Sequence, residues 1–298
     1  MLRLEDGYLV IGEGSNVLFT KYFNGCIIHN NIRGIEVLRE QENMVWVRTG
    51  AGERWHEFVL FSIKLGWGGI ENLSLIPGTV GATPVQNIGA YGIEVADVIE
   101  SVQTFDTETL QWNELSQSDC RFGYRDSIFK QELKGRVIIS SVVYKLQKKH
   151  NLHLEYGAIR DELKKRKILN PGIGDISDIV CAIRSSKLPD PKQTGNAGSF
   201  FKNPVVEEEI FKLIAANHPL VPYHRAGDGY KIPAGWLIEQ AGWKGHRDGP
   251  VGCYEKQALI LVNHGGANGK DVVRLANHIR ASIKEKFGID LQLEVNII

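Results

Sequence analysis

Three glycine-rich loops within the first 92 residues most constrain what this chain can fold into. They span residues 12–16, 77–84 and 86–92, and the first follows a compact apolar run at residues 8–11 that predicts a buried strand. Such loops can turn several backbone N–H groups toward one anion, such as a pyrophosphate. Any one of them is more simply a tight turn, but three together favour nucleotide binding. The sequence contains neither G-x-G-x-x-G nor G-x-x-x-x-G-K-[ST], which argues against a Rossmann site and a P-loop.

Apolar patterns indicate a mixed α/β and α+β chain with a break after residue 186. Before the break they predict strands at residues 25–30, 44–49, 98–105 and 137–146, and helices at residues 53–65, from about 156, and 177–186. After it they predict helices at residues 206–217, 234–241 and 270–287, strand material at 251–262, and an alternating strand at 291–298. Pro189 and Pro191 exclude both regular helix and central strand from residues 187–192, so we place the domain boundary there.

Composition excludes several classes of protein. The chain has 35 Lys and Arg against 35 Asp and Glu, so it has no global attraction for nucleic acid or anionic lipid. No apolar run approaches the roughly 20 residues of a membrane-spanning helix, and residues 1–6 are too polar for a signal peptide. Four scattered cysteines without a C-x-x-C pair predict reduced thiols in a cytoplasmic protein. The nine histidines lack metal-site spacing, so no metal is expected.

Three further segments carry candidate chemistry. In residues 120–130 an arginine beside aromatic residues can offer a planar fork to a carboxylate, although an exposed loop with a cation–π pair is the simpler interpretation. Ser199 follows small residues that leave its side chain accessible. No G-x-S-x-G sequence or His–Asp pattern supports a hydrolase nucleophile. The simpler interpretation is a hydroxyl that is hydrogen-bonded to nearby backbone. Glu294 interrupts an apolar terminal strand, where periodicity alone favours a solvent-facing position.

Taken together, residues 12–16, 76–92, 120–130, 187–204 and 234–241 resemble the UDP-N-acetylenolpyruvoylglucosamine reductases (the MurB family) of bacterial cell-wall precursor synthesis, and the resemblance runs over essentially the whole chain. It implies an FAD-binding domain of the PCMH/vanillyl-alcohol-oxidase-like type with two subdomains at residues 1–186. A smaller α+β substrate-binding domain would follow at residues 187–290, and the strand at 291–298 would return to the active site. It further implies a cytoplasmic monomer that does not insert into membranes.

The resemblance also implies the reaction. FAD would be the cofactor, NADPH the co-substrate, and UDP-N-acetylglucosamine enolpyruvate the substrate of a ping-pong reduction to UDP-N-acetylmuramate. Arg125 would hold the enolpyruvyl carboxylate and the developing charge, Ser199 would donate a proton, and Glu294 would act with Arg125 to stabilise the enol intermediate. The FAD-loop positions would be Gly12, Gly14, Ser15, Asn16, Pro77, Gly78, Gly81, Gln86, Asn87, Gly89 and Gly92. The substrate contacts would be Tyr124, Tyr156, Lys187, Asn203 and Gln257.

For some of these positions a structural role is an alternative to substrate binding. Tyr156 and Gln257 could serve simple packing or surface polarity, although Tyr156 matches a loop that folds over the substrate in one subtype of the family. Family members normally carry a strand–helix segment before residues 8–11, and we interpret its absence as a start codon assigned at an internal Met. An N-terminally extended chain should then hold FAD more tightly. Two other functions stay open. The first is a related FAD oxidase of the same fold, which the sequence of residues 195–204 argues against. The second is a flavin-free remnant that binds UDP-sugars.

Overall fold

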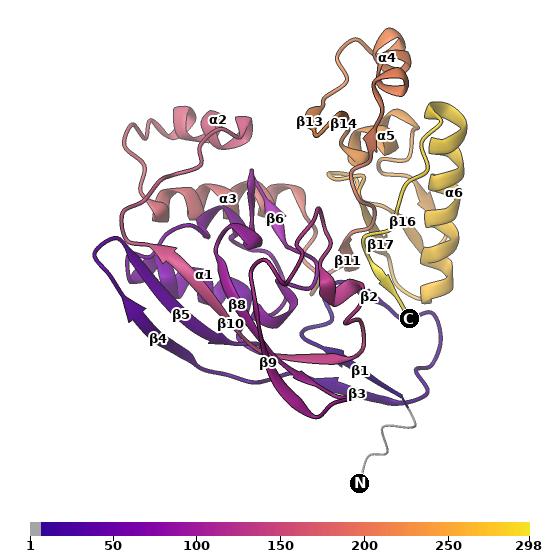
Figure 1. The fold of residues 1–298 in the computed structure, drawn as a ribbon. Coiled ribbons are helices and arrows are strands. Elements are labelled where there is room, and N and C mark those ends of the chain that lie inside the picture. Colours follow the sequence, from indigo (N-terminus) through magenta and orange to yellow (C-terminus); the bar gives the residue numbers. More distant parts are fainter. Residues whose placement is uncertain (1–6) are drawn as a thin grey trace. The chain divides into compact units, whose positions relative to one another are not determined.

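The computed structural model describes residues 7–298, so the polar residues 1–6 considered above lie outside the described part. The chain divides into two compact units (Figure 1). The first consists of Asn24–Ser186 with the described residues up to Ser15, and the second of Lys187–Ile298 with Asn16–Phe23. The assignment of a cofactor domain and a substrate domain to these parts remains a prediction.

A five-stranded antiparallel sheet organises the first unit. Its order is β4 (Ile35–Glu40), β5 (Met44–Gly50), β10 (Val137–Gln147), β8 (Ile99–Asp106) and β9 (Gln111–Ser116). The central strand β10 is rich in Val and Ile, which suit a sheet buried on both faces, and it pairs with β5 and β8. A parallel pair, β1 (Tyr8–Ile11) and β3 (Cys26–His29), and a short pair, β6 (Gly89–Ala90) and β7 (Ile93–Glu94), complete the strands of this unit. The predicted strands are confirmed, whereas the edge strands β4 and β9 were not predicted.

Helix α1 (Trp55–Lys64) buries one face in the core of the first unit. Trp55 and Phe58 pack against Tyr144 of β10, with ring centroids 5.8 and 5.1 Å from the tyrosine ring. Burial of each such side chain contributes about 1.5–3 kcal/mol. The indole N–H of Trp55 donates a 2.9 Å hydrogen bond to the carbonyl of Leu73, so this buried polar group is satisfied. The core therefore fixes the position of α1 over the sheet.

Two more helices end the first unit and share a small core of their own. They are α2 (Gly157–Arg166) and α3 (Ile173–Lys187). The residues that form the core are Ile159, Leu163, Ile176, Ile179, Val180 and Ile183. Helix α3 begins four residues before the predicted Ser177, where Asp175 accepts the N–H of Gly172 at 2.8 Å. This bond satisfies the backbone donor of the residue directly before the helix, which apolar spacing alone does not show.

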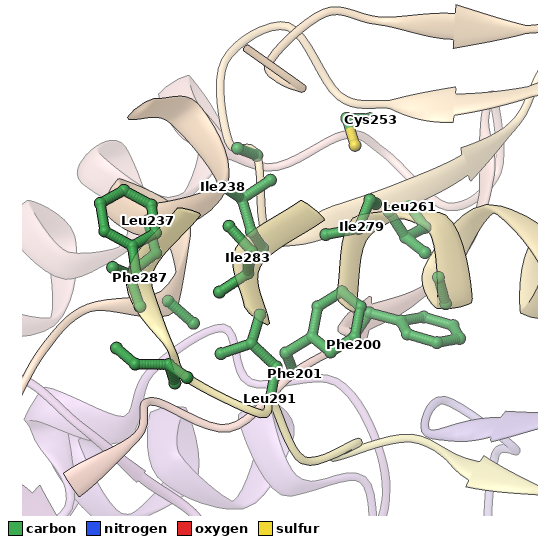
Figure 2. Close-up of a cluster of buried hydrophobic side chains, with 14 of the residues drawn as sticks. Phe200, Phe201, Leu237, Ile238, Cys253, Leu261, Ile279, Ile283, Phe287 and Leu291 are labelled. Atoms are coloured by element: carbon green, nitrogen blue, oxygen red, sulfur yellow. The ribbon is translucent and has the colours of Figure 1, made fainter. Parts of the chain in front are cut away.

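The second unit packs three helices with two larger sheets and a short parallel pair of strands. The strands are β11 (Gly195–Ser199), β17 (Ile260–Asn263), β16 (Val251–Cys253) and β15 (Arg247–Asp248) in one sheet, and β12 (Val205–Val206), β14 (Gly229–Lys231) and β13 (His224–Ala226) in the other. The helices are α4 (Glu208–Asn217), α5 (Ala234–Gln240) and α6 (Gly269–Phe287). In the core, Leu237 and Ile238 of α5 lie with Ile279 and Ile283 of α6 (Figure 2).

Helix α6 has well-defined ends. The Asn268 side chain accepts the N–H of Lys270 at 2.9 Å and that of Asp271 at 3.2 Å, and Asp271 accepts the N–H of Asn268 in return. Gly288 ends the helix with a φ of 69°, a conformation that favours glycine. Its buried face includes Val272, Ala276, Ile279 and Ile283. A Cβ on Gly269 would lie 2.0 Å from the carbonyl oxygen of Phe19, so this glycine permits residues 16–23 to pack here.

The predicted continuous strand at residues 291–298 is wrong. Only Asn296–Ile297 (β18) forms a strand, which pairs in parallel with β2 (Val17–Leu18), while Leu293 forms a single bridge with Phe201. The apolar alternation is real, because Leu291 and Val295 are buried. The backbone, however, changes hydrogen-bonding partner along the segment, so no single ladder can form.

No helix within residues 7–298 is long and apolar enough to cross a membrane.

Candidate active site

The first two glycine-rich loops lie against each other in the first unit. A Cβ on Gly12 would stand 2.3 Å from Oγ1 of Thr79, and a Cβ on Gly78 would stand 3.0 Å from Oγ of Ser15. Gly14 and Gly78 have φ values of 68° and 113°, which favour glycine. Both loops therefore require glycine, because their backbones approach each other too closely for a larger side chain.

Glu13 links the two loops and was not predicted. Its carboxylate accepts the N–H of Gly78 at 3.3 Å and forms a 2.8 Å ion pair with the Nε of Arg54, which directly precedes α1. A carboxylate between two loop glycines is the sequence signal that could have indicated this link. Glu13 thereby ties the loop after β1 to the loop that enters the short helix at Val80–Ala82.

Backbone hydrogen bonds fasten the second loop to the core. The carbonyl of Gly78 accepts the N–H of Trp55 at 3.0 Å, and the N–H of Gly81 donates to the carbonyl of Ala51 at 2.8 Å. A Cβ on Gly81 would lie 2.6 Å from the Cβ of Ala51, so the close approach requires glycine. Pro77 is exposed and Gly78 is buried at this point. The loop is held mainly by its own backbone.

The third loop positions Arg125. The guanidinium donates from Nη1 to the carbonyl of Asn87 at 3.2 Å and from Nη2 to the carbonyl of Gly89 at 2.5 Å. A Cβ on Gly89 would lie 3.0 Å from Nη1, so this glycine makes room for the side chain. Arg125 itself has a φ of 53°, and its guanidinium lies 5.4 Å from the ring of Tyr124, which is half-buried. The arginine is fixed by backbone acceptors before any substrate binds.

Asn87 is the centre of a buried polar network. Only 1% of it is exposed, and its φ is 44°. Its Nδ2 donates to the Glu94 carboxylate at 2.7 Å and to the carbonyl of Gly123 at 3.0 Å, and its Oδ1 accepts the N–H of Ala96 at 3.1 Å. The residue predicted to bind the cofactor thus also joins the third loop to the turn that carries Arg125. Glu94 was not predicted, and no sequence pattern marks it.

The remaining predicted residues of the first unit belong to the third loop or lie beside it. The ring of Tyr156 contacts that of Tyr91 edge-on, with centroids 5.2 Å apart. The buried Asn72 donates to the carbonyls of Tyr91 at 3.1 Å and His153 at 3.0 Å, which joins the loop to the segment before Tyr156. Gln86 is half-buried, and Gly92 has a φ of 84°. Tyr156 therefore lies beside the third loop.

The thiol nearest the Arg125 turn in sequence is chemically inert. Burial raises the pKa of Cys120 to about 12, so the thiol is neutral at physiological pH. Its backbone carbonyl accepts the N–H of Ile128 at 2.9 Å. Cys120 is therefore a core residue that shapes the turn and not a nucleophile.

In the second unit, Ser199 and Glu294 lie on neighbouring backbone segments. The N–H of Glu294 donates to the carbonyl of Phe200 at 2.9 Å, and its carbonyl accepts from Nδ2 of Asn16 at 3.3 Å. Both Ser199 and Glu294 are half-buried, so Glu294 is not the fully exposed residue that periodicity alone favoured. Asn16, predicted as a cofactor residue, belongs to this unit.

A bulge in β11 sets the position of Ser199. Its pairing with β17 shifts register between Asn196 and Ser199, where Gly198 has a φ of 77° and donates its N–H to Oδ1 of Asn196 at 3.0 Å. A bulge re-aims the side chain that follows it and is common next to active sites. The small residues noted in the sequence therefore have a conformational role here.

Asn203 and Gln257 lie together at the first turn of α5. Oδ1 of Asn203 accepts the N–H of Ala234 at 2.9 Å, and a Cβ on Gly235 would lie 2.8 Å from Oε1 of Gln257. Lys187, the last residue of α3, is exposed. Among residues 7–298, no group of three or more His, Cys, Asp or Glu side chains could hold a metal ion.

The loops of the first unit fit a dinucleotide with a pyrophosphate, because Gly14 has a positive φ and open space on its Cβ side, and such a turn can present backbone N–H groups to an anion. Residues 5–109 match the family model described as an FAD binding domain. The fold and its loops thus define an FAD-binding protein that uses neither a Rossmann fingerprint nor a P-loop.

The second unit and relatives that match nearly the whole chain identify the family. Residues 190–298 match the model of the C-terminal domain of UDP-N-acetylenolpyruvoylglucosamine reductase. The chain is 50% identical to the UDP-N-acetylenolpyruvoylglucosamine reductase of Amoebophilus asiaticus, over 97% of this chain and 86% of that relative. It is also 50% identical to the one of Dechloromonas aromatica, over 98% and 88%. The chain belongs to the UDP-N-acetylenolpyruvoylglucosamine reductase family.

A solved structure agrees on the fold. The UDP-N-acetylenolpyruvylglucosamine reductase (MurB) from Thermus caldophilus superposes with a TM-score of 0.66, at 24% sequence identity. The match covers 97% of this chain and 85% of that chain. Together with the FAD-binding and C-terminal domain models, this likeness confirms the mixed fold class predicted from the sequence.

Proposed function

We propose that this chain catalyses the FAD-dependent reduction of UDP-N-acetylglucosamine enolpyruvate to UDP-N-acetylmuramate, a step of peptidoglycan precursor synthesis. The observation that carries the proposal is the 50% identity to a reductase of that name over 97% of the chain. FAD supplies the hydride chemistry when it is bound. We propose NADPH as the co-substrate. We also propose that the protein acts as a monomer in the cytoplasm. Roles in cell shape, the cell cycle and cell division belong to the same proposal.

The predicted FAD-loop positions would hold the cofactor through their backbone. The close packing of Gly12 on Thr79 and of Gly78 on Ser15 supports this role, because any larger residue at either glycine would push the two loops apart. The extent of the cofactor domain, residues 1–186, and of the substrate domain, residues 187–290, is part of the proposal.

Arg125 would bind the carboxylate of the enolpyruvyl group. Its guanidinium keeps a planar fork that two backbone carbonyls hold in place, so little reorganisation is needed when substrate arrives. As the double bond is reduced, negative charge develops toward the carboxylate, and a fixed cation there stabilises the transition state. Arg125 is therefore proposed to hold the substrate and its charge.

Ser199 would donate a proton to the enolpyruvyl carbon next to the carboxylate, after the neighbouring carbon has received the hydride. The bulge at Gly198 supports this role, since it sets the direction of the serine on the strand. Glu294 would assist by stabilising the enol intermediate, and its backbone bond to Phe200 keeps it on the segment beside Ser199. We propose Tyr124, Tyr156, Lys187, Asn203 and Gln257 as substrate contacts.

The experiment that tests this function is anaerobic turnover of the purified protein reconstituted with FAD. We expect flavin absorption bands, bleaching by NADPH, and recovery of the bands on addition of UDP-N-acetylglucosamine enolpyruvate with formation of UDP-N-acetylmuramate. Protein that takes up no FAD would contradict the proposal. Recovery only with oxygen would instead indicate the related oxidase.

A further inference from the structure

Leu75 has a backbone conformation that leucine rarely adopts. Its φ is 58°, in the left-handed region that favours glycine. It stands directly before residues 76–78, where the second glycine-rich loop begins and Gly78 faces Ser15. Such a conformation persists only where the surrounding structure holds it. What holds Leu75 therefore also determines where the loop starts.

Two side chains hold the two polar backbone groups of Leu75. Its N–H donates to Nδ1 of His56 at 3.0 Å, and its carbonyl accepts from Nε of Arg184 at 3.2 Å. His56 lies on α1 and Arg184 on α3, so the contacts come from two separate helices. The histidine makes its contact as an acceptor, which requires that Nδ1 carry no proton.

The surroundings of His56 keep it neutral. Burial and the positive charge of Arg184 lower the pKa of His56, while Glu57 on the same helix acts in the opposite direction. The other ring nitrogen, Nε2, lies 4.0 Å from Sγ of Cys181 on α3, and burial raises the pKa of that thiol, so it brings no charge. At neutral pH the imidazole thus has a free lone pair at Nδ1.

We propose that neutral His56 is a positioning residue that holds Leu75, and through it the second glycine-rich loop, in the conformation that binds FAD. The proposal deepens the proposed function and rests on it, because it requires FAD to bind at this loop. Protonation of His56 turns Nδ1 into a donor that faces the N–H of Leu75, so the contact is lost. The affinity for FAD must then fall as the pH drops through the pKa of His56.

The sign of the effect follows from linkage. The FAD-binding conformation favours neutral His56, so bound FAD lowers the pKa of His56 further. FAD affinity should be constant at neutral and alkaline pH and should fall only at pH values below 6.5, since the pKa of His56 lies under this ordinary value. Loss of one hydrogen bond of this kind corresponds to about a fivefold weaker affinity.

The test compares His56→Leu, which has no acceptor, with His56→Asn, whose Oδ1 can accept at the position of Nδ1. FAD dissociation from the holoenzyme and FAD affinity are followed by flavin fluorescence between about pH 8 and pH 5, the range around the ordinary histidine pKa. His278→Asn, on the exposed face of α6, is the control. We expect about fivefold weaker FAD binding for His56→Leu at neutral pH, near-normal binding for His56→Asn, and loss of the acid-side decline in both.

Each result is decisive. If His56→Leu fails to fold, as thermal unfolding would show, the pH profile of His56→Asn carries the test alone. A variant that binds FAD with the wild-type affinity and the wild-type pH profile would overturn the proposal and leave the proposed function intact. Wild-type protein that takes up no FAD at any pH would overturn the proposed function first.

Discussion

The two units hold their candidate catalytic residues in opposite ways. Arg125 stands in a strained turn, and polar contacts to the backbone of Asn87 and Gly89 fix it. Ser199 and Glu294 instead lie on extended segments whose neighbours, such as Phe201 and Leu291, are 1% and 0% exposed. The first arrangement depends on hydrogen bonds made in a confined loop, and the second on close packing of apolar side chains. They should therefore fail under different substitutions.

The largest expected effect lies in the second unit. Phe201→Ala removes a fully buried ring and should destabilise the protein by about 3–5 kcal/mol, because the lost burial is added to the cost of a cavity. Urea denaturation measures the change. Leu220→Ala, at a side chain that is 93% exposed, is the control and should change stability by less than about 0.5 kcal/mol. Equal changes for the two variants would remove the contrast between the units.

The next largest effect is expected from replacing the planar guanidinium of Arg125. Arg125→Lys keeps the charge but cannot bond both backbone carbonyls and a carboxylate, so kcat should fall by about 10²–10³-fold. The fold should be unaffected, which distinguishes this effect from that of Phe201→Ala. Arg121→Lys is the matched control, since Arg121 is 63% exposed and pairs with Glu132. Steady-state kinetics compares them, and a kcat equal to that of the control would argue against a role for Arg125.

A smaller effect is expected at the polar network behind Arg125. Asn87→Ala leaves buried partners unsatisfied, including the carbonyl of Gly123, which costs about 1–3 kcal/mol of stability. It should also lower kcat, because the turn that carries Arg125 loses its hydrogen bond to the Asn87 side chain, although Arg125 itself is unchanged. Asn113→Ala, at an exposed position of β9, controls for the loss of an amide. Unchanged stability and kcat in Asn87→Ala would show that the network is not needed.

The smallest effect concerns acid stability, and it is confined to the first unit. A hydrogen bond from Arg136, with a 2.7 Å ion pair, lowers the pKa of Asp106 to about 2. Since the folded-state pKa lies below the unfolded value of 3.8, the pair stabilises the fold above about pH 4, and this contribution is lost as the pH falls toward 2. Asp106→Asn should flatten thermal stability in that range. An identical acid slope in the variant would contradict this prediction.

Elements with strong apolar periodicity could be predicted from the sequence. Strand β10 and helix α6 are examples, because each buries one consistent set of side chains. The edge strand β9 could not, since five of its six residues are exposed and leave no apolar pattern. The error at residues 291–298 has another cause: the side chains alternate, but the backbone changes partner between Phe201 and β2.

The candidate site shows the same division. Several features can be identified from the amino-acid order alone: the three glycine-rich loops, the absence of either nucleotide fingerprint, and the segments that contain Arg125, Ser199 and Glu294. The groups that hold these elements in place could be found only in the folded chain. Arg125 is held by the carbonyl of Gly89 and Leu75 by Arg184, partners that are 36 and 109 residues apart in the sequence. Hydrogen bonds between such distant residues follow no local periodicity, because the folded core brings the partners together.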